Sequence, residues 1–436
     1  MTLELIEVPA SFYDYEVMTS NGEKFPANKD IKHYRGIVKD IENSLVAITF
    51  YKDEMIGLVS TDEGNFNIVK DYQSGKHLFY NERNLKEKSD MICGTIDDPF
   101  LSYEPEVLFK QRSILSEKAS VAQARAINKE VRFYVETEYD IYQTRGSISS
   151  VEAYIVGLFN QVAVLYQNED ILTNVASIHI WTVNDPYTGT NTSSLLSQFQ
   201  RTRTSIIGDL GILLTFRDIG GGEAAGFNGL CSSTDQKLSV AMLYNNEIIG
   251  SNYSWSVYVI THELGHLFGS RHTHACVWNG NNTAIDGCAG YTESTDPNGS
   301  FGNCPVPPIP PSGTMMSYCH LYSILNFNLG FGSQPGNVIR NNVTNANCLY
   351  PCNSPINFTN QTVTQGVIIN SCGDINIQNV TITSGATLTL KAADDINVQN
   401  VTVNNNSKLI LDAAGEVNII SDFEVESGSE FEIIYP

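Results

Sequence analysis

Apolar and polar residues alternate in short runs through the first hundred positions. The run from Ser44 to Phe50 alternates clearly, and a second run from Met55 to Ser60 follows after a polar turn at residues 52–54. An alternation with a period of two predicts strands that bury one face, and a polar turn between two such runs predicts a hairpin. We therefore expect residues 1–101 to form a small β-rich domain.

Residues 131–352 have a different pattern, in which strand-like and helix-like segments follow one another. The expected strands lie at 131–136, 177–183, 212–216 and 239–244, and the expected helices lie at 150–166 and 194–207. Strands that alternate with helices predict an α/β domain.

The segment between these two regions, residues 102–130, is polar and rich in Lys, Arg, Gln and Ala. This composition predicts an exposed linker, in which Arg112, Arg125 and Lys129 are accessible to a trypsin-like protease. We expect the chain to be cleavable here.

The last region, residues 353–436, contains an internal repeat. The sequence Asp374–Ile382 recurs almost unchanged as Asp395–Val403, a period of 21 residues, and Val417–Ile419 begins a third, weaker copy. Short strands at this period, with Gly and Asn at the corners, predict a small all-β repeat module similar to a β-solenoid, in which each rung buries its face on the next. A plain β-sandwich is the alternative.

The composition narrows the class of protein. The formal net charge of −22 repels phosphate backbones and anionic membrane surfaces, which argues against nucleic acid as a partner. The excess of acidic residues favours an extracellular protein. It also favours binding of calcium, in addition to any catalytic metal. No apolar run reaches the roughly 18 to 20 residues that a membrane span needs.

The cysteines point to the same compartment. Of the nine cysteines, eight lie between Cys231 and Cys372, and Cys93 stands alone. Such clustering is typical of disulfides, so we expect a secreted protein whose signal peptide is absent from this sequence; a cytosolic protein with reduced cysteines is the alternative. Pairing of Cys372 with Cys352 or with Cys348 would tie the last module to the α/β domain.

The chemistry is concentrated in the segment from Thr261 to His272, which reads Thr-His-Glu-Leu-Gly-His-Leu-Phe-Gly-Ser-Arg-His. His262 and His266 are four residues apart and therefore lie on one helical face, where both imidazoles can reach one metal ion. Gly269 lets the chain leave the helix sharply, which brings His272 back as a third ligand.

Three protein ligands leave one position of a zinc ion open for water. Zinc lowers the pKa of this water, and Glu263 accepts its proton, so that the hydroxide attacks a carbonyl carbon. A His-Glu-x-x-His sequence alone arises by chance in many proteins, but the extension to Gly269 and His272 makes the assignment far more specific.

The extended pattern is the metzincin signature, and the continuation His272-Thr-His-Ala-Cys276 resembles bacterial members of the reprolysin (adamalysin) branch. This resemblance implies an α/β catalytic domain at residues 131–352, with a mixed five-stranded sheet and an active-site helix, that hydrolyses proteins or peptides. The segment His33–Gly36 and the strands after it resemble the propeptide of that family, so residues 1–101 are expected to be a prodomain.

Two further segments carry the resemblance. Ser312–Cys319 resembles the Met-turn beneath the metal, and we assign its methionine to Met316, because Ser317 and Tyr318 follow it; Met315 is the alternative. Cys93 stands where the cysteine switch of a zymogen would lie, and a thiolate that fills the open zinc position would inhibit the enzyme in cis. A buried core thiol or half of a disulfide is the other interpretation.

Three features differ from the reprolysin pattern or allow more than one interpretation. His274 could compete with His272 for the metal, although the spacing favours His272. Tyr318 resembles the tyrosine that donates a hydrogen bond to the transition state in the astacin and serralysin branches; otherwise it packs in the wall of the specificity pocket. Gly220–Gly226 would suit either the edge strand for an extended substrate or a plain loop.

These observations favour a secreted zinc metalloendopeptidase that is synthesised as a latent zymogen. One alternative is an adhesive or binding protein with a vestigial protease domain, although no ligand and no catalytic Glu is missing. The other is a zinc hydrolase of a non-peptide bond, since an activated water also attacks esters.

Overall fold

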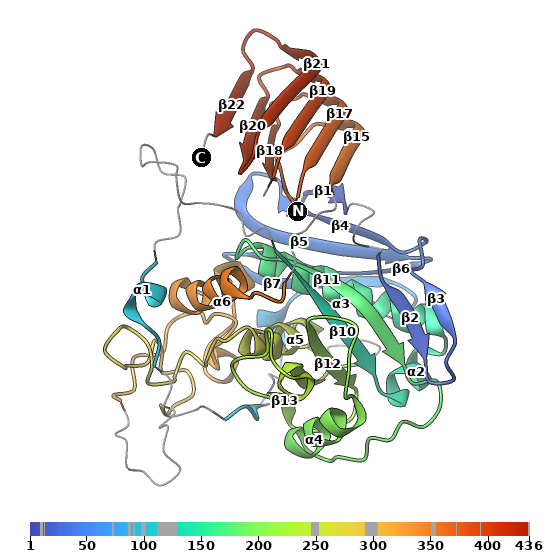
Figure 1. The fold of residues 1–436 in the computed structure, drawn as a ribbon, viewed down its shortest axis with the longest axis vertical. Coiled ribbons are helices and arrows are strands. Elements are labelled where there is room, and N and C mark those ends of the chain that lie inside the picture. Colours follow the sequence, from blue (N-terminus) through green and yellow to red (C-terminus); the bar gives the residue numbers. More distant parts are fainter. Residues whose placement is uncertain are drawn as a thin grey trace.

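The structure, a computed structural model, describes residues 1–8, 12, 14–71, 74–85, 89, 92–96, 102–110, 129–245, 253–292, 304–349, 355–371, 373–392 and 394–434. Most of the predicted linker, including Arg112 and Arg125, lies outside these residues. Its described ends are not fully exposed as expected, because Leu108 is buried against Trp278 and Lys129 donates hydrogen bonds to the carbonyls of Thr344 and Ala346. The C-terminal strands lie at one end of the molecule and the N-terminal antiparallel sheet lies next to them (Figure 1). A second sheet with its helices forms the other end.

The N-terminal region forms a six-stranded antiparallel sheet in the order β1-β4-β5-β6-β7-β8. The strands are β1 Leu3–Glu7, β4 Lys32–Val38, β5 Ile41–Tyr51, β6 Glu54–Thr61, β7 Gly64–Lys70 and β8 His77–Asn81. The two alternating runs of the sequence lie in β5 and β6, and the turn between them places Lys52 at a φ of 54°.

A second, central sheet has eight strands in the order β3-β2-β11-β10-β12-β14-β13-β9. Five strands come from the α/β region: β10 Glu130–Thr137, β11 Leu172–Ile180, β12 Leu210–Thr215, β13 Gly221–Ala224 and β14 Leu238–Met242. Three come from the N-terminal region: β2 Glu16–Thr19, β3 Lys24–Pro26 and β9 Ile92–Cys93.

The mixed five-stranded sheet expected for the catalytic region is therefore present, and N-terminal strands enlarge it to eight. The five strands are mixed, because β13 runs antiparallel to β14 while the others are parallel. Both of their edges are extended by N-terminal strands: β2 pairs with β11, and β9 pairs with β13. An edge strand offers unpaired N–H and C=O groups, and here residues distant in sequence satisfy them.

The helices are α1 Pro105–Leu108, α2 Tyr139–Arg145, α3 Ile148–Gln167, α4 Thr192–Thr202, α5 Tyr253–Leu267 and α6 Ser333–Asn345. The side chain of Ser147 caps α3, and Asn191 with Ser194 forms a capping box on α4. Helix α4 ends earlier than its pattern predicts, because Arg203 adopts an extended conformation and donates a hydrogen bond to Glu136 at 2.8 Å.

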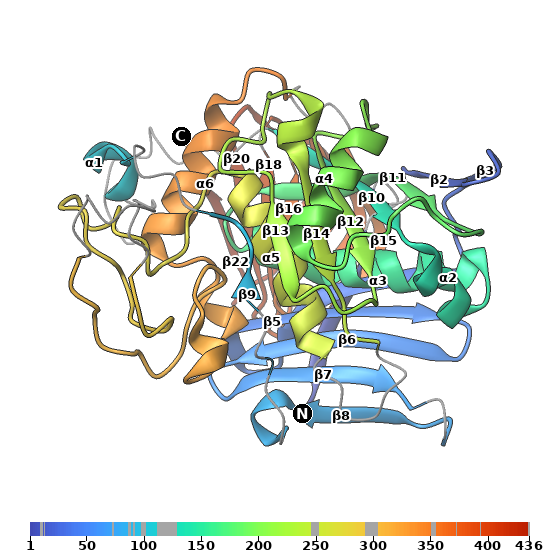
Figure 2. The ribbon, with the colours of Figure 1, turned by 90° about the horizontal axis from the view of Figure 1, so that it is seen from below.

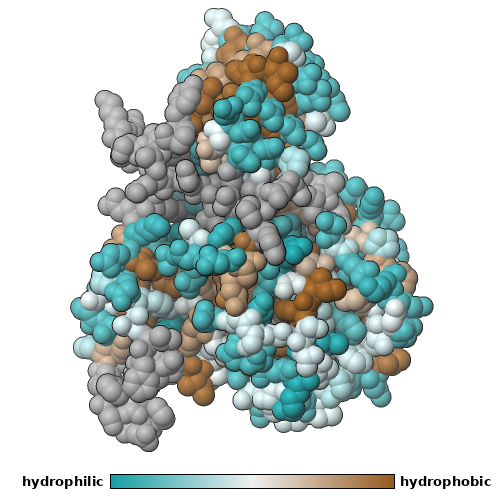
Figure 3. All heavy atoms as spheres, in the orientation of Figure 1, coloured by the Kyte–Doolittle hydropathy of each residue, from teal (hydrophilic) through white to brown (hydrophobic). Residues whose placement is uncertain are grey.

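The C-terminal region consists of two four-stranded parallel sheets. One contains β15 Ile356–Val363, β17 Ile375–Ile382, β19 Ile396–Val403 and β21 Val417–Val425, and the other contains β16 Val367–Ser371, β18 Thr387–Ala392, β20 Lys408–Ala413 and β22 Glu430–Ile434. Ile375 pairs with Ile396, and Ile396 pairs with Val417. Figure 3 shows apolar surface on this module. Ile419 and Ile420 of β21 are among its exposed apolar residues.

Within the described residues, α3 is a helix long and apolar enough to cross a membrane, yet 78% of its apolar window is buried in the structure. It packs against β11 of the central sheet and against β5 of the N-terminal sheet. Burial on two faces explains its composition, since a helix that covers a single sheet needs only one apolar stripe.

Candidate active site

The site is built on helix α5. His262 and His266 lie on one face of this helix, which ends at Leu267, and Gly269 then adopts a φ of +107°. This left-handed conformation favours glycine, and a Cβ here would also displace the side-chain amide of Asn342, whose Nδ2 it would approach to 2.0 Å. The chain turns back and brings His272 to the other two histidines.

The three imidazoles converge through their Nε2 atoms. Nε2 of His266 lies 3.2 Å from Nε2 of His262 and 3.1 Å from Nε2 of His272. Nδ1 of His262 donates to the carbonyl of Met315 at 2.7 Å, and Nδ1 of His266 donates to the carbonyl of Ser270 at 2.8 Å. A carbonyl can only accept, so these two rings are protonated at Nδ1 and their Nε2 lone pairs face each other.

This arrangement fits a metal ion. Lone pairs at such distances repel unless a cation lies between them, and tetrahedral zinc would hold two imidazole nitrogens about 3.3 Å apart. Burial, followed by the neighbouring His266 and His272, holds the pKa of His262 well below its usual value. The imidazole is therefore neutral, as a metal ligand must be.

Cys93 supplies a fourth donor atom. Its Sγ lies 3.4 Å from Nε2 of His266, and the four donor atoms of Cys93, His262, His266 and His272 all lie within 4.8 Å of one another. The cysteine is not in a disulfide. Burial, and next the charge of Glu263, raises the pKa of its thiol, so a thiolate here requires an adjacent cation.

Glu263 lies beside these four donors. Its Oε2 accepts hydrogen bonds from Sγ of Cys93 at 3.4 Å and from Oγ1 of Thr95 at 3.3 Å. Burial raises the pKa of Glu263 to about 8. A divalent cation on the three histidines would favour the ionised carboxylate, which is the form that accepts a proton.

The segment that carries Cys93 lies against the edge strand β13, as Figure 2 also shows. Ile92 and Cys93 pair in parallel with Gly221 and Gly222. A Cβ at Gly222 would lie 2.5 Å from Oε1 of Glu263, so only glycine lets the strand pass so close to the carboxylate. Of the two interpretations of Gly220–Gly226, the structure has the edge strand.

Gly94 and Thr95 are site residues that sequence reasoning missed. A Cβ at Gly94 would lie 2.4 Å from Oε2 of Glu223, and the hydroxyl of Thr95 accepts the N–H of Ala224 at 2.8 Å. The only sequence signal was the glycine directly after Cys93.

Both methionines of the predicted Met-turn are fully buried and have different contacts. A Cβ at Gly265 on α5 would lie 2.8 Å from Sδ of Met316, so the Met316 thioether lies directly against the active-site helix. Met315 contributes its carbonyl to His262 instead.

Tyr318 and His274 flank the histidines. The hydroxyl of Tyr318 accepts the N–H of Cys93 at 3.1 Å and donates to the Cys93 carbonyl at 3.2 Å. The ring of His274 stacks on His272, with centroids 4.9 Å apart, and packs against Tyr318. His272, rather than His274, therefore brings a nitrogen to the cluster.

Disulfides brace the surrounding loops. The described pairs are Cys231–Cys348, Cys276–Cys304 and Cys288–Cys319. Of the two pairings considered for Cys372, the one with Cys348 is wrong, because Cys348 is bonded to Cys231. Cys352 and Cys372 lie outside the described residues. The bond at Cys319 ties the segment after Met316 and Tyr318 to the loop that follows His274.

Three carboxylates in the C-terminal module, those of Asp374, Asp394 and Asp395, also lie within 4.8 Å of one another. Two of them accept backbone N–H groups, from Asp395 at 3.1 Å and from Glu416 at 2.7 Å. These two carboxylates are therefore used in backbone turns, and the cluster gives no calcium assignment.

A helix with two metal-facing histidines and a carboxylate, together with a third histidine after a glycine, defines the class of the protein as a zinc metallopeptidase. Residues 128–305 match the reprolysin model of metallopeptidase family M12. This segment therefore forms a reprolysin-like metalloprotease domain.

Comparison with solved structures gives distant likenesses. Metalloproteinase-II from Bacteroides fragilis is 13% identical with a TM-score of 0.35, and the match covers 64% of this chain and 82% of that one. A chaperone–substrate complex is 11% identical with a TM-score of 0.29, and the match covers 68% and 38%. No curated protein matches the chain.

Proposed function

We propose that the protein is a secreted zinc-dependent metalloendopeptidase that is synthesised as a latent zymogen. The observation that carries this proposal is the convergence of the Nε2 atoms of His262, His266 and His272 next to the carboxylate of Glu263. These three histidines would hold the metal, and Glu263 would be the general base.

Zinc, when bound, supplies Lewis acidity to the scissile carbonyl and lowers the pKa of a bound water. Glu263 lies where it can take the proton of that water and hand it to the leaving amine. Tyr318 presents its hydroxyl to the same space, where it would donate to the developing oxyanion. An extended substrate would pair with β13 after Ile92 and Cys93 have left it.

Latency is supported by three contacts of one short segment. The thiol of Cys93 lies with the three imidazoles, Thr95 donates to Glu263, and Tyr318 bonds to the backbone of Cys93. The segment thus engages each group that the reaction needs. Cleavage within residues 102–130 would allow it to leave the cleft.

Secretion is supported by the disulfides. Three bonds between well-separated cysteines are stable in an oxidising compartment and rare in the cytosol. The C-terminal module would then act outside the cell as a targeting or stabilising element.

The test compares the intact chain and the chain cut in the linker, with Glu263→Gln as the variant. The wild type, once cut, should contain one zinc per chain and digest a denatured protein. The variant should keep the zinc and lose digestion by at least a factor of 10³. A variant that digests normally contradicts the mechanism, and a wild type without zinc or peptidase activity favours the vestigial alternative. Hydrolysis of esters alone would indicate a non-peptide substrate.

A further inference from the structure

Helix α3 has almost no solvent-facing side. Its buried residues run without interruption from Val151 to Tyr166, and they include Glu152, Asn160 and Gln161. The central sheet covers one face, and the N-terminal sheet covers the other. The catalytic region by itself would therefore leave one apolar face of its longest helix uncovered.

The two regions share one hydrophobic core. Tyr15, Ile31, Ile56 and Val69 of the N-terminal region belong to the same cluster as residues of α3, β10 and α5. A Cβ at Gly157 of α3 would lie 2.3 Å from Cδ1 of Ile56, so the N-terminal sheet lies directly on the helix. Apolar contact of this kind contributes roughly 25 cal/mol for each Å² removed from water.

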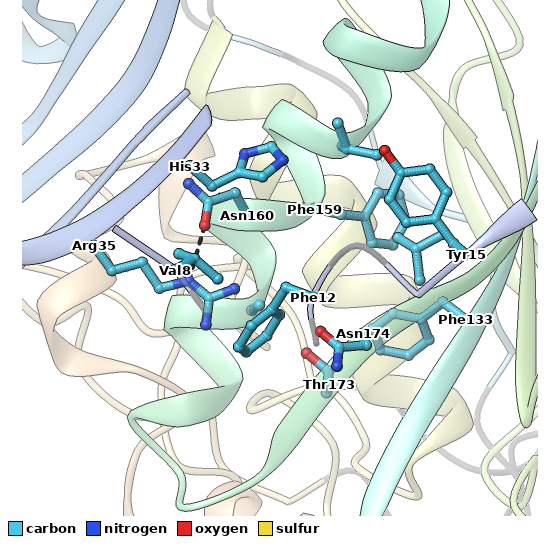
Figure 4. A pocket seen from close by; sticks show the side chains of 13 residues that line it. Val8, Phe12, Tyr15, His33, Arg35, Phe133, Phe159, Asn160, Thr173 and Asn174 are labelled. Atoms are coloured by element: carbon cyan, nitrogen blue, oxygen red, sulfur yellow. Dashed lines mark hydrogen bonds between the residues drawn. The ribbon is translucent and has the colours of Figure 1, made fainter. Parts of the chain in front are cut away.

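Polar groups of α3 depend on the same interface. Oε1 of Glu152 accepts hydrogen bonds from the Tyr15 hydroxyl at 3.0 Å and from the N–H of Asn28 at 2.7 Å. Oδ1 of Asn160 accepts a hydrogen bond from Nε of Arg35 at 2.8 Å. Figure 4 shows this bond at the small cavity between β4 and α3. Glu152 and Asn160 therefore have their hydrogen-bond partners in the N-terminal region, and separation of the two regions would break these buried bonds.

An ion pair reinforces the contact. Arg145 of α2 donates from one nitrogen to both carboxylate oxygens of Glu54, at 2.8 Å each. The Arg145 side chain is only 1% exposed. Loss of the Glu54 carboxylate would remove this ion pair from a buried guanidinium, which is costly.

The segment around Cys93 is bound far less extensively. It adds two residues to the edge of the central sheet, and the side chains flanking it, Ile92 and Ile96, are 51% and 88% exposed. Residues 92–96 are held by backbone pairing, by the thiol, and by the hydroxyls of Thr95 and Tyr318. None of these five residues belongs to a hydrophobic core cluster of the described residues, so they can leave without exposing a core, whereas the N-terminal sheet cannot. The chain after them is anchored separately, where Leu108 packs with Trp278.

We propose that residues 1–84 are a permanent structural subunit of the enzyme and stay bound to the catalytic region after the linker is cut. Activation then displaces only the segment around Cys93. The second statement rests on the proposed zymogen function, whereas the first is independent of catalysis.

The test uses the full chain, cut by trypsin in the linker under native conditions and applied to a size-exclusion column. We expect the N-terminal fragment to co-elute with the catalytic fragment in equal amounts. Cys93 should react with a thiol reagent at least tenfold faster than in the uncut chain. Separate elution of the two fragments, with a monodisperse folded catalytic fragment, would overturn the proposal. Digestion of residues 1–84 to small peptides with the same catalytic fragment left behind would also overturn it.

Glu54→Gln weakens the interface without touching the site, and Glu63→Gln, at an exposed carboxylate of the same sheet, is its matched control. After cleavage, Glu54→Gln should raise the dissociation constant of the fragments at least tenfold, and Glu63→Gln should leave it unchanged. Equal constants for all three proteins would contradict the role of the interface. Because co-elution is read without a substrate, a chain that retains its fragment but shows no peptidase activity refutes the proposed function alone.

Discussion

The hydroxyl of Thr95 lies 3.3 Å from Oε2 of Glu263 and accepts the N–H of Ala224. Since the hydroxyl has one hydrogen and its oxygen is already bonded to the backbone, this hydrogen is directed at the carboxylate. Thr95 therefore connects the candidate general base to the edge strand β13. Latency in this chain would depend on two side chains, Cys93 and Thr95.

The first prediction concerns Thr95. Thr95→Val keeps the shape and removes a hydrogen bond to a charged group, worth about 1.5 kcal/mol, which is roughly a tenfold change. The uncut variant should react about tenfold faster at Cys93 with a thiol reagent, and Thr95→Ser should restore the slow rate. Ile96→Ala, at a side chain 88% exposed, is the control and should behave like wild type. A slow rate in Thr95→Val would rule out this contact.

His272 and His274 should differ in their effect on zinc binding. His272→Ala removes one of the three converging nitrogens, so zinc measured by mass spectrometry in the purified protein should fall below about a tenth of the wild-type content. His274→Ala should keep the metal, because the ring of His274 stacks on His272 and its nitrogens are not part of the donor cluster. Zinc loss in the His274 variant but not in the His272 variant would reverse the assignment.

Replacement of Cys93 by Ser tests the switch itself. A serine hydroxyl is a much weaker zinc ligand than a thiolate, so the uncut Cys93→Ser chain should digest protein without prior cleavage. Wild type should need the cut first. Equal latency in the two uncut chains would show that inhibition does not depend on the thiol.

The Tyr318 hydroxyl can stabilise the transition state, or its side chain can form part of the specificity pocket that binds the substrate. If its hydroxyl donates to the oxyanion, Tyr318→Phe lowers kcat by about 10²-fold and leaves KM nearly unchanged. We expect this result in the cut enzyme. A raised KM with unchanged kcat would instead place Tyr318 in the wall of the specificity pocket.

The stability of the N-terminal interface should depend on pH through Glu82. Burial raises the pKa of this carboxyl from 4.5 to about 7, and Ser254 at the start of α5 donates to it. Between these two values the folded chain binds more protons than the unfolded chain. Stability therefore falls as pH rises through this window and stays lower above about 7.

Glu82→Gln should flatten that dependence, which for a partly exposed side chain is on the order of 1–2 kcal/mol. Thermal unfolding of the uncut chain between pH 4.5 and 8 measures it, with Glu63→Gln as the control. An unchanged slope in Glu82→Gln would assign the pH dependence to other groups.

The histidine cluster could be predicted from the sequence because its geometry is local. His262 and His266 share a helical face, and one glycine turn returns His272 to them, so a short segment contains the information. The strands of the catalytic region were equally readable, since β10, β11, β12 and β14 are apolar runs bounded by turns.

Other features could not be read in this way. The strands β2, β3 and β9 are two to four residues long and have no detectable period, and their pairing depends on distant edges of the central sheet. The contacts of Thr95 and Gly222 with Glu263 depend on that pairing. The apolar pattern of α3 predicted a helix, but the second sheet that covers it is visible only in three dimensions.

The parallel register of the C-terminal strands restricts how this module can change in length. Ile375, Ile396 and Val417 are equivalent positions 21 residues apart. Rungs of 19 and 22 residues also occur, at Ile356–Ile375 and Leu409–Phe431, so the turns tolerate small changes in length while the paired positions are kept. Deletion of one complete rung would join equivalent backbone positions and shorten the stack by one rung. Natural variation in the size of this module should therefore occur as whole rungs.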